Sequence, residues 1–192
     1  MGMLKSDLRI TKTKQALEEA LLTLLQEKPL KSISITEICR LAKINRGTFY
    51  LHYGQIEDLF EEYYKEIMKD LTDSYQEPYR HVDILNPREL NPSTIRIFHH
   101  IETYKNFYRI VFSRTVPMSY YYLLFNQVQD LLKRDMELTL KTSVDPAMLS
   151  AYQANAILGL IIEWGRNDFQ QPAEDMNLLL VRILNIQTES RR

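Results

Sequence analysis

Side chains that commonly do chemistry in enzymes are present in this sequence, but they form no catalytic or metal-binding motif. His99 and His100 are adjacent and Glu102 follows, yet neighbouring residues on a helix point about 100° apart and cannot easily share one metal ion. The sequence contains no G-x-S-x-G, no glycine-rich phosphate loop and no H-E-x-x-H. We therefore predict that the protein is not an enzyme and holds neither a metal nor a cofactor.

The pattern that best indicates a binding function lies in the segment SITEICRLAKINRGTFYLHYGQIEDLF, which begins at Ser34. A capping box, Ser34 with Glu37, predicts the start of one short helix, and the N-cap residue Asn45 predicts the start of a second. Two short helices joined by a tight turn are the plan of a helix-turn-helix unit. In such a unit the second helix lies in the major groove of DNA.

The second of these helices opens with side chains that suit the edges of bases. Arg46 offers guanine two parallel hydrogen bonds, Gly47 lets the backbone approach closely, and Thr48 offers a hydroxyl or a methyl. Tyr50 and His52 can reach phosphate oxygens, which position a protein without reading sequence. The start of the first of the two short helices, at Ser34 and Thr36, is a second candidate phosphate anchor. The candidate DNA-binding residues are Ser34, Thr36, Arg46, Gly47, Thr48, Tyr50, Leu51 and His52.

Several of these residues also have a purely structural interpretation. Phe49 is expected to be a core aromatic because it lies on the inward face of its helix. The alternatives are that Arg46 is a solvated surface arginine, that Thr48 only packs, and that Tyr50 is a core aromatic as well. Charge gives DNA modest support, since residues 1–54 carry nine Lys and Arg against five Asp and Glu, whereas the remainder carries 15 against 20. A solvated helix face also explains an excess of this size.

The spacing of apolar residues predicts the helices that would position these side chains. It is clearest after Gly54, where steps of three and one continue over four turns. The stretch 76–92 contains three prolines and is predicted to be a loop. We predict an all-α fold of about nine helices, with a helix-turn-helix domain in residues 1–54 and a second helical domain in 55–192. The expected helices are 8–27, 34–41, 46–52, 56–71, 93–104, 105–113, 118–142, 146–168 and 173–187.

About residues 8–70, which include this segment, resemble the DNA-binding domain of the TetR family of bacterial transcriptional regulators. Three departures from that family's pattern matter: Lys43 replaces a turn glycine, Asn45 replaces a serine, and Ile56 replaces a lysine that commonly holds a phosphate. Lys43 is expected either to adopt a left-handed conformation or to change the turn, while Asn45 can still cap its helix. The matching runs are Ser34-Ile35-Thr36-Glu37-Ile38-Cys39, Ala42-Lys43-Ile44-Asn45, Gly47-Thr48-Phe49-Tyr50-Leu51-His52-Tyr53 and Ile56-Glu57-Asp58-Leu59.

The resemblance extends to individual residues of this domain. Cys39 corresponds to a small buried residue of the family and is expected to be an inert thiol. Loss of the lysine at Ile56 should weaken the affinity for the DNA backbone. Cations of the N-terminal arm are expected to compensate, namely Lys5, Arg9, Lys12 and Lys14.

The same resemblance implies a homodimer. In the family the last two long helices, here near 146–168 and 173–187, pair with those of a second subunit. Ala156 and Gly159 are small enough for close helix approach. We also expect a cytoplasmic protein with no membrane span, because the sequence has one cysteine and no secretory signal, and the apolar run 156–162 is far shorter than the roughly 20 residues that a bilayer requires.

Aromatic residues are concentrated between the DNA-binding domain and the last two long helices. They predict a pocket for an unknown small-molecule effector of apolar or aromatic character, and the alternative is that they are ordinary core and interface residues. At most one or two of the consecutive tyrosines at 120–122 can face one pocket. The candidate ligand-binding residues are Tyr104, Phe107, Tyr108, Phe112, Tyr121, Phe125 and Trp164.

These observations together predict a ligand-responsive transcriptional regulator that binds a palindromic operator in double-stranded DNA as a homodimer. The resemblance to the family implies that it represses transcription. The alternative prediction is a family member with weak DNA binding that acts as a co-activator or protein-partner module. The isoleucine at position 56 and the acidic character of residues 55–192 favour that alternative.

Overall fold

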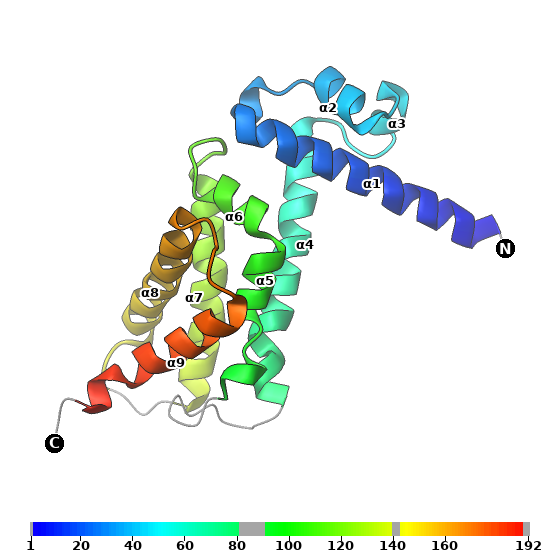
Figure 1. Ribbon diagram of the computed structural model, residues 1–192. Helices are drawn as coiled ribbons and strands as arrows, with labels where there is room; N and C mark the ends of the chain where they lie inside the picture. The colour runs from blue at the N-terminus through cyan, green and yellow to red at the C-terminus, as the bar shows by residue number, and fades with distance from the viewer. Residues whose placement is uncertain (1, 81–90, 140–142, 190–192) are drawn as a thin grey trace. The chain divides into compact units, whose positions relative to one another are not determined.

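A computed structural model describes residues 2–80, 91–139 and 143–189, and the side chains of 8–79, 91–134 and 143–186. Over these residues it contains nine α-helices and no strand, which confirms the all-α prediction (Figure 1). The helices are α1 (Gly2–Glu27), α2 (Ile35–Ala42), α3 (Arg46–Tyr50), α4 (Ile56–Gln76), α5 (Ile97–Thr103), α6 (Lys105–Val111), α7 (Ser119–Thr139), α8 (Pro146–Arg166) and α9 (Ala173–Glu189). Short 3₁₀ turns are η1 (Leu30–Ser32), η2 (Glu77–Arg80) and η3 (Pro92–Thr94).

Several helix boundaries differ from the sequence-based prediction. The first helix begins at Gly2 instead of residue 8, and the second of the short helices ends at Tyr50 instead of 52. The helix expected from residue 93 begins at Ile97, because η3 occupies residues 92–94 and Ile95 is extended. Most of the expected loop at 76–92 lies outside the described residues, as do 140–142.

The described chain forms two compact units. Unit 1 comprises Met1–Ile67 and Arg109–Tyr120, and unit 2 comprises Met68–Tyr108 and Tyr121–Arg192. Helices α4, α6 and α7 each contribute residues to both units. The domain boundary expected at residue 54 stays a prediction.

In unit 1 the core forms where α1 packs against α2 and α2 packs against α3. Leu17, Leu21 and Leu25 recur every four residues along α1 and are completely buried, so they lie on one face of that helix. The segment from Arg109 joins this unit through a backbone hydrogen bond of 2.8 Å from Leu30 N–H to the carbonyl of Thr115. Figure 1 shows α1 running beside α2 and α3.

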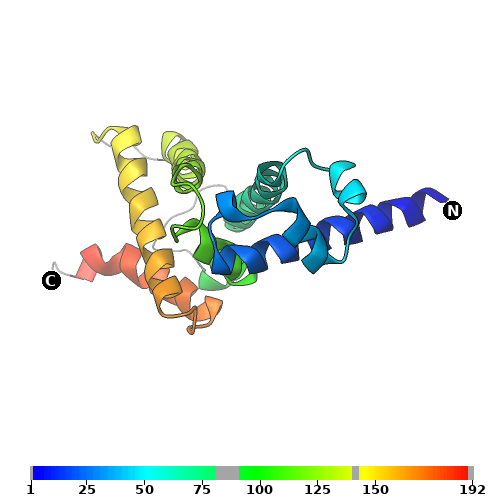
Figure 2. The same cartoon turned by 90° about the horizontal axis from the view of Figure 1, so that it is seen from above.

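In unit 2, α5 packs against α9 near η3. The side-chain amide of Asn177 in α9 donates to the carbonyl of Ile95 at 3.1 Å. Trp164 of α8 packs between Phe98 and Phe169, with ring centroids 5.8 and 5.1 Å away, and its Nε1–H donates to the carbonyl of Gln171. These contacts fix the turn from which α8 and α9 leave in different directions (Figure 2).

The turn between α2 and α3 contains the first departure from the family pattern. Lys43 has φ 57° and ψ 40°, a left-handed conformation in which it caps α2. The structure thereby confirms the first of the two outcomes expected for this residue. A left-handed conformation costs a residue with a Cβ about 1 kcal/mol relative to glycine.

Lys43→Gly is therefore expected to raise the free energy of unfolding by about 1 kcal/mol. Urea denaturation followed by circular dichroism measures this change. The matched control is Lys12→Gly, an exposed lysine within α1, which should lower the free energy of unfolding by about 1 kcal/mol because glycine is a poor helix former. Destabilisation by both substitutions would show that the turn is not strained.

Candidate nucleic-acid interface

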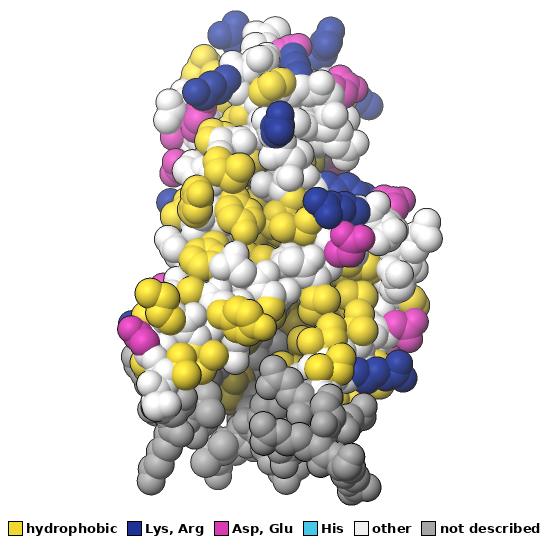
Figure 3. Space-filling view, turned by 90° about the vertical axis from the view of Figure 1, so that its left-hand side faces the viewer, with side chains coloured by type: hydrophobic (Ala, Val, Ile, Leu, Met, Phe, Trp, Pro, Cys, Tyr) yellow, Lys and Arg dark blue, Asp and Glu magenta, His cyan; other side chains and the backbone are white. Residues whose placement is uncertain are grey.

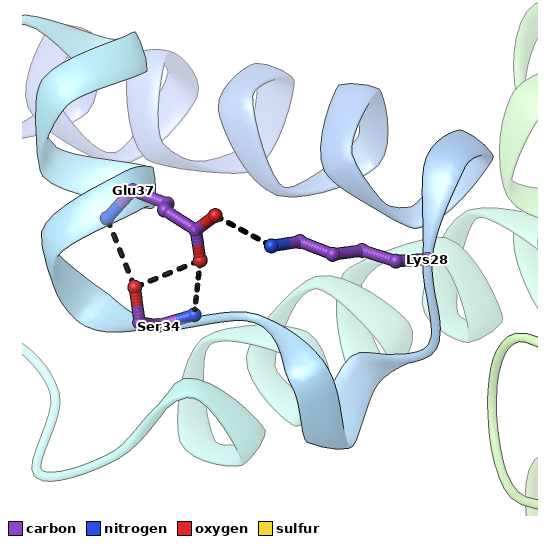
Figure 4. A network of polar contacts seen from close by, with 3 residues as sticks. All are labelled: Lys28, Ser34 and Glu37. Carbon is purple, nitrogen blue, oxygen red and sulfur yellow. Dashed lines mark hydrogen bonds and ion pairs between the residues drawn. The ribbon is translucent and has the colours of Figure 1, made fainter.

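The start of α2 is held by a network of three side chains (Figure 4). The backbone N–H and the hydroxyl of Ser34 both donate to Oε2 of Glu37, at 3.0 and 2.8 Å, and the N–H of Glu37 donates to Ser34 Oγ. Lys28 Nζ donates to the other carboxylate oxygen of Glu37 at 2.5 Å. Hydrogen bonds from Lys28 and Ser34 lower the pKa of Glu37 to about 2, so its carboxylate stays ionised.

This network bears on the phosphate anchor expected at Ser34 and Thr36. Both donors of Ser34 already serve Glu37, so Ser34 can meet a phosphate only after these bonds rearrange. Thr36 is exposed in the first turn of α2. Of the two residues, Thr36 is the one placed to donate its hydroxyl without breaking an existing bond to Glu37.

Helix α3 presents four rows of side chains, each formed by residues four positions apart. The inner row consists of Phe49, which is completely buried, and Tyr53, which is 4% exposed, and the core position expected for Phe49 is confirmed. The outer rows pair Arg46 with Tyr50, Gly47 with Leu51 and Thr48 with His52. All six of these residues are exposed or half-buried.

The beginning of α3 is capped by Asn45, whose Oδ1 accepts from the N–H of Gly47 at 2.8 Å. The substitution of the family's serine therefore preserves the cap. At the other end the N–H of Leu51 donates to the carbonyl of Gly47 at 3.2 Å, which continues the helical path beyond Tyr50. The neighbouring Tyr50 hydroxyl raises the pKa of the exposed Arg46 guanidinium, which therefore remains a cation.

Of the cations expected to compensate for the lysine that Ile56 replaces, Lys14 is already bound within the fold. Its Nζ donates to Oε1 of Glu62 in α4 at 2.5 Å and lies 5.9 Å from the ring centroid of Tyr53. Lys14 thus joins α1 to α4 and is not presented outward. Arg9 and Lys12 are exposed and line an open groove of about 350 Å³ whose floor includes Ala16 and Ile44. The side chain of Lys5 lies outside the described residues.

The start of α4 differs from the family's phosphate-holding arrangement. Ile56, which replaces the lysine, is 7% exposed and belongs to the core of unit 1. Asp58 accepts from the backbone N–H groups of Gly54 and Gln55 at 3.0 and 3.1 Å. A hydrogen bond from the Gln55 side chain is the main cause that lowers the pKa of Asp58. The carboxylate of Asp58 therefore already binds the N–H groups of the two residues that precede α4.

A carboxyl group between α1 and α4 has an altered pKa. Burial, followed by the charges of Glu66 and Glu62, raises the pKa of Glu18 to about 7. The same environment contains Lys14, which lowers that pKa. Glu18 is therefore partly protonated near neutral pH in the folded protein.

The candidate effector residues fall into several groups. Phe112 belongs to unit 1 and the other six to unit 2. Tyr104 and Tyr108 lie against His100, with ring centroids 4.9 and 5.7 Å away, and Phe107 packs on Tyr108. Phe107, Tyr108 and Trp164 are buried, whereas Tyr104, Phe112, Tyr121 and Phe125 are half-buried. Trp164 packs with Phe98 and Phe169, as described above.

Sequence reasoning missed a chain of polar contacts around the buried His100 in unit 2. Nδ1 of His100 lies 2.5 Å from Oδ2 of Asp70, and Nε2 lies 2.8 Å from the hydroxyl of Tyr108. Burial lowers the pKa of His100; when neutral, the ring can donate to Asp70 and accept from Tyr108. Nε2 of the adjacent His99 instead lies 3.2 Å from Oε1 of Glu174 in α9. The two histidines thus diverge as the sequence predicted, but no sequence signal connects Asp70 to a residue 30 positions away.

Comparison with known proteins gives matches in both parts of the chain. A model described as bacterial regulatory proteins, tetR family, matches residues 17–63, and one described as transcriptional regulator C-terminal region, TetR_C_8, matches residues 88–186. An uncharacterized HTH-type transcriptional regulator of Bacillus subtilis, YxbF, is 23% identical over 153 residues. This alignment covers 79% of the chain but 39% of the relative, so the chain spans about two fifths of that protein's length.

Solved structures have the same fold. A TetR transcriptional regulator from Streptococcus agalactiae is 24% identical with a TM-score of 0.61, covering 96% of this chain and 99% of that one. The fatty acid degradation regulator FadR from Bacillus halodurans is 14% identical with a TM-score of 0.68, covering 90% and 94%. The dihydroxyacetone kinase operon activator DhaS is 19% identical with a TM-score of 0.63, covering 92% and 96%. No helix within the described ranges is long and apolar enough to cross a membrane.

The raised pKa of Glu18 predicts a pH-dependent stability. The folded protein binds this proton more tightly than the unfolded chain, whose carboxyl has a pKa near 4.5, so the contribution is complete below pH 4.5 and is lost as the pH rises to about 7. Glu18→Gln should therefore raise the free energy of unfolding at pH 8, by roughly 1 kcal/mol after solvent screening, and change it little at pH 4.5. Denaturation at both pH values measures this, with Glu27→Gln, at an exposed position of the same helix, as control. An equal effect of Glu18→Gln at both pH values would contradict the prediction.

Proposed function

Because the chain belongs to the TetR family of bacterial regulatory proteins, we propose that it is a homodimeric, ligand-responsive transcriptional repressor that acts in the cytoplasm on a palindromic operator. The observation that carries the proposal is the distribution of buried and exposed side chains around α3. Phe49 and Tyr53 form one buried row, and the side chains of the other rows are exposed or half-buried. A helix anchored in this way can enter the major groove without losing its own support.

Within this proposal the exposed rows of α3 have different roles. Arg46 and Thr48 lie in the first turn and read base edges, whereas Tyr50 and His52 lie later and contact phosphates. The permanent charge of Arg46 suits a guanine, whose O6 and N7 accept two hydrogen bonds from one guanidinium. Thr36 supplies a further phosphate contact from the start of α2.

Backbone affinity in this proposal comes mainly from α1. Arg9 and Lys12 are exposed and three positions apart, so they lie on one face of the helix. Their groove includes Ile44, which immediately precedes the Asn45 cap of α3. Lys14 contributes no phosphate contact, because Glu62 already neutralises it.

The proposed dimer uses the exposed surface of α8 and α9. Figure 3 shows hydrophobic side chains gathered on the side of unit 2 that carries these helices. A Cβ added to Gly159 would meet no atom of its own chain within 4 Å, which leaves room for a second copy to approach closely. The exposed large apolar residues of the two helices are Met148, Tyr152, Leu178, Leu179, Ile183, Leu184 and Ile186.

The proposed effector binds in unit 2 among the half-buried aromatic residues Tyr104, Tyr121 and Phe125. An apolar ligand fits these side chains, and two structurally similar proteins are a fatty acid degradation regulator and a regulator solved in complex with stearoyl-CoA. Binding would switch DNA affinity only if the ligand prefers one of two conformations. The fluorescence of Trp164, the single tryptophan, tests this; no change with any acyl ligand would count against it.

A co-activator or protein-partner module is the second candidate. The buried Ile56 favours it, because this residue removes a phosphate contact that the family pattern supplies. The two candidates differ in whether the purified protein shifts any palindromic duplex at low salt.

Substitutions in α3 and α1 are expected to affect DNA binding differently. Against a duplex selected from a random pool, Arg46→Ala should cost about 1–3 kcal/mol per half-site and relax the preference at one base pair. Arg9→Ala or Lys12→Ala should weaken all duplexes alike and reduce the salt slope by about 2 per dimer, one phosphate contact per subunit. Titrations of selected and scrambled duplexes at several salt concentrations measure both effects.

Lys14→Ala is the matched control in α1. It removes a cation of the same arm but should leave the salt slope unchanged, because Lys14 is paired with Glu62. The assignment fails if Lys14→Ala lowers the slope as much as Arg9→Ala does, or if Arg46→Ala weakens both duplexes equally.

Gly159→Glu is expected to raise the dissociation constant of the dimer by about tenfold or more, because it places an unpaired charge in an apolar interface. The subunit itself should fold, since Gly159 is exposed and a Cβ added there meets no described atom within 4 Å apart from its own helix backbone. Light scattering over a range of concentrations measures the change, with Asn126→Glu, an exposed position in α7, as control. If Gly159→Glu leaves the dimer intact, the interface lies elsewhere.

A further inference from the structure

The outer row of α3 formed by Gly47 and Leu51 is apolar, and no described side chain of unit 1 covers it. Leu51 is 81% exposed, more than any other large hydrophobic residue among the described side chains. Its N–H donates to the carbonyl of Gly47 at 3.2 Å, so Leu51 lies one helical turn beyond Gly47. Side chains four residues apart on a helix share a face, and Thr48, three residues before Leu51, adjoins it.

Nothing within the described chain requires glycine at position 47. Its φ is not positive, and a Cβ added there would meet only Oδ1 of Asn45, at 3.4 Å, an ordinary contact. Alanine would therefore fit, and it favours a helix by about 1 kcal/mol over glycine. The space at Gly47 is therefore open apart from the contact with Asn45.

The neighbouring row has the opposite character. Arg46 and Tyr50 are both exposed and carry polar groups that suit base edges or phosphates. An apolar strip next to a polar one, on a helix of a basic segment, matches the major groove of DNA, where the C5-methyl of thymine is the apolar group that base edges present. One side chain and one bare turn are far too small for a protein interface, which buries about 800 Å² per partner.

We propose that Gly47, Thr48 and Leu51 form a socket for the C5-methyl of a thymine in each half-site. The proposal rests on the DNA binding proposed above and deepens it, since it names a base and the group of that base that is recognised. The methyl packs against the Leu51 side chain and the Thr48 methyl, and the missing side chain of Gly47 lets it approach the backbone. Leu51 then determines sequence specificity through an apolar contact, alongside the hydrogen bonds of Arg46.

The test uses a duplex selected from a random pool by the full-length dimer. Each thymine is replaced in turn by deoxyuridine, which removes the methyl and leaves the Watson–Crick edge unchanged. At one position in each half-site the wild-type affinity should fall about fourfold per methyl, the change expected for one buried methyl-sized group. Leu51→Ala should bind the unmodified duplex more weakly and should no longer distinguish thymine from deoxyuridine at that position.

The control is Leu123→Ala, which shortens a leucine in α7 that is 49% exposed and should keep the full response to deoxyuridine. Because Leu51 is mostly exposed, Leu51→Ala should unfold at the wild-type temperature. If deoxyuridine has no effect at any position, or if Leu51→Ala keeps the wild-type response, the socket is refuted while DNA binding stands. Failure to select any duplex at low salt would refute the proposed function and the socket with it.

Discussion

A helix of five residues such as α3 cannot persist alone in water, because nucleating a helix is unfavourable and few hydrogen bonds follow. What holds α3 is the burial of Phe49 and Tyr53, whose rings lie 5.6 Å apart on its inner row. This single row determines how the helix is turned about its own axis. The remaining side chains must then face outward, which is why Arg46, Leu51 and their neighbours are available to a partner.

The charges of unit 1 divide into those that hold the fold and those that are presented outward. Lys28 and Lys14 are each paired with a glutamate, Glu37 in the first case and Glu62 in the second. These pairs are partly buried, so their geometry limits what they can offer to a phosphate. Arg9, Lys12 and Arg46 are exposed. Because Glu62, the partner of Lys14, lies outside residues 1–54, the net charge of those residues overstates the positive charge that a polyanion would meet.

Unit 2 depends on contacts between residues far apart in the sequence. His100 connects Asp70 of α4 to Tyr108 of α6, while the adjacent His99 faces Glu174 of α9. The short helix α5 thus contacts partners in three other helices. Helices α4 and α6 also contribute residues to unit 1.

The sequence by itself determined the all-α class, the capping of α2 and α3, the burial of Phe49 and the left-handed option at Lys43, because each of these depends on residues within a few positions of one another. It also identified the family through its local motifs. Only the tertiary structure decided that Lys14 serves Glu62, that Ile56 belongs to the core, that Lys28 binds the capping residue Glu37, and that His100 bridges Asp70 and Tyr108. For Lys14 and His100 the physical reason is the same: their partners Glu62 and Asp70 lie 48 and 30 positions away in the sequence. Local periodicity carries no information about which distant partner a helix face will meet.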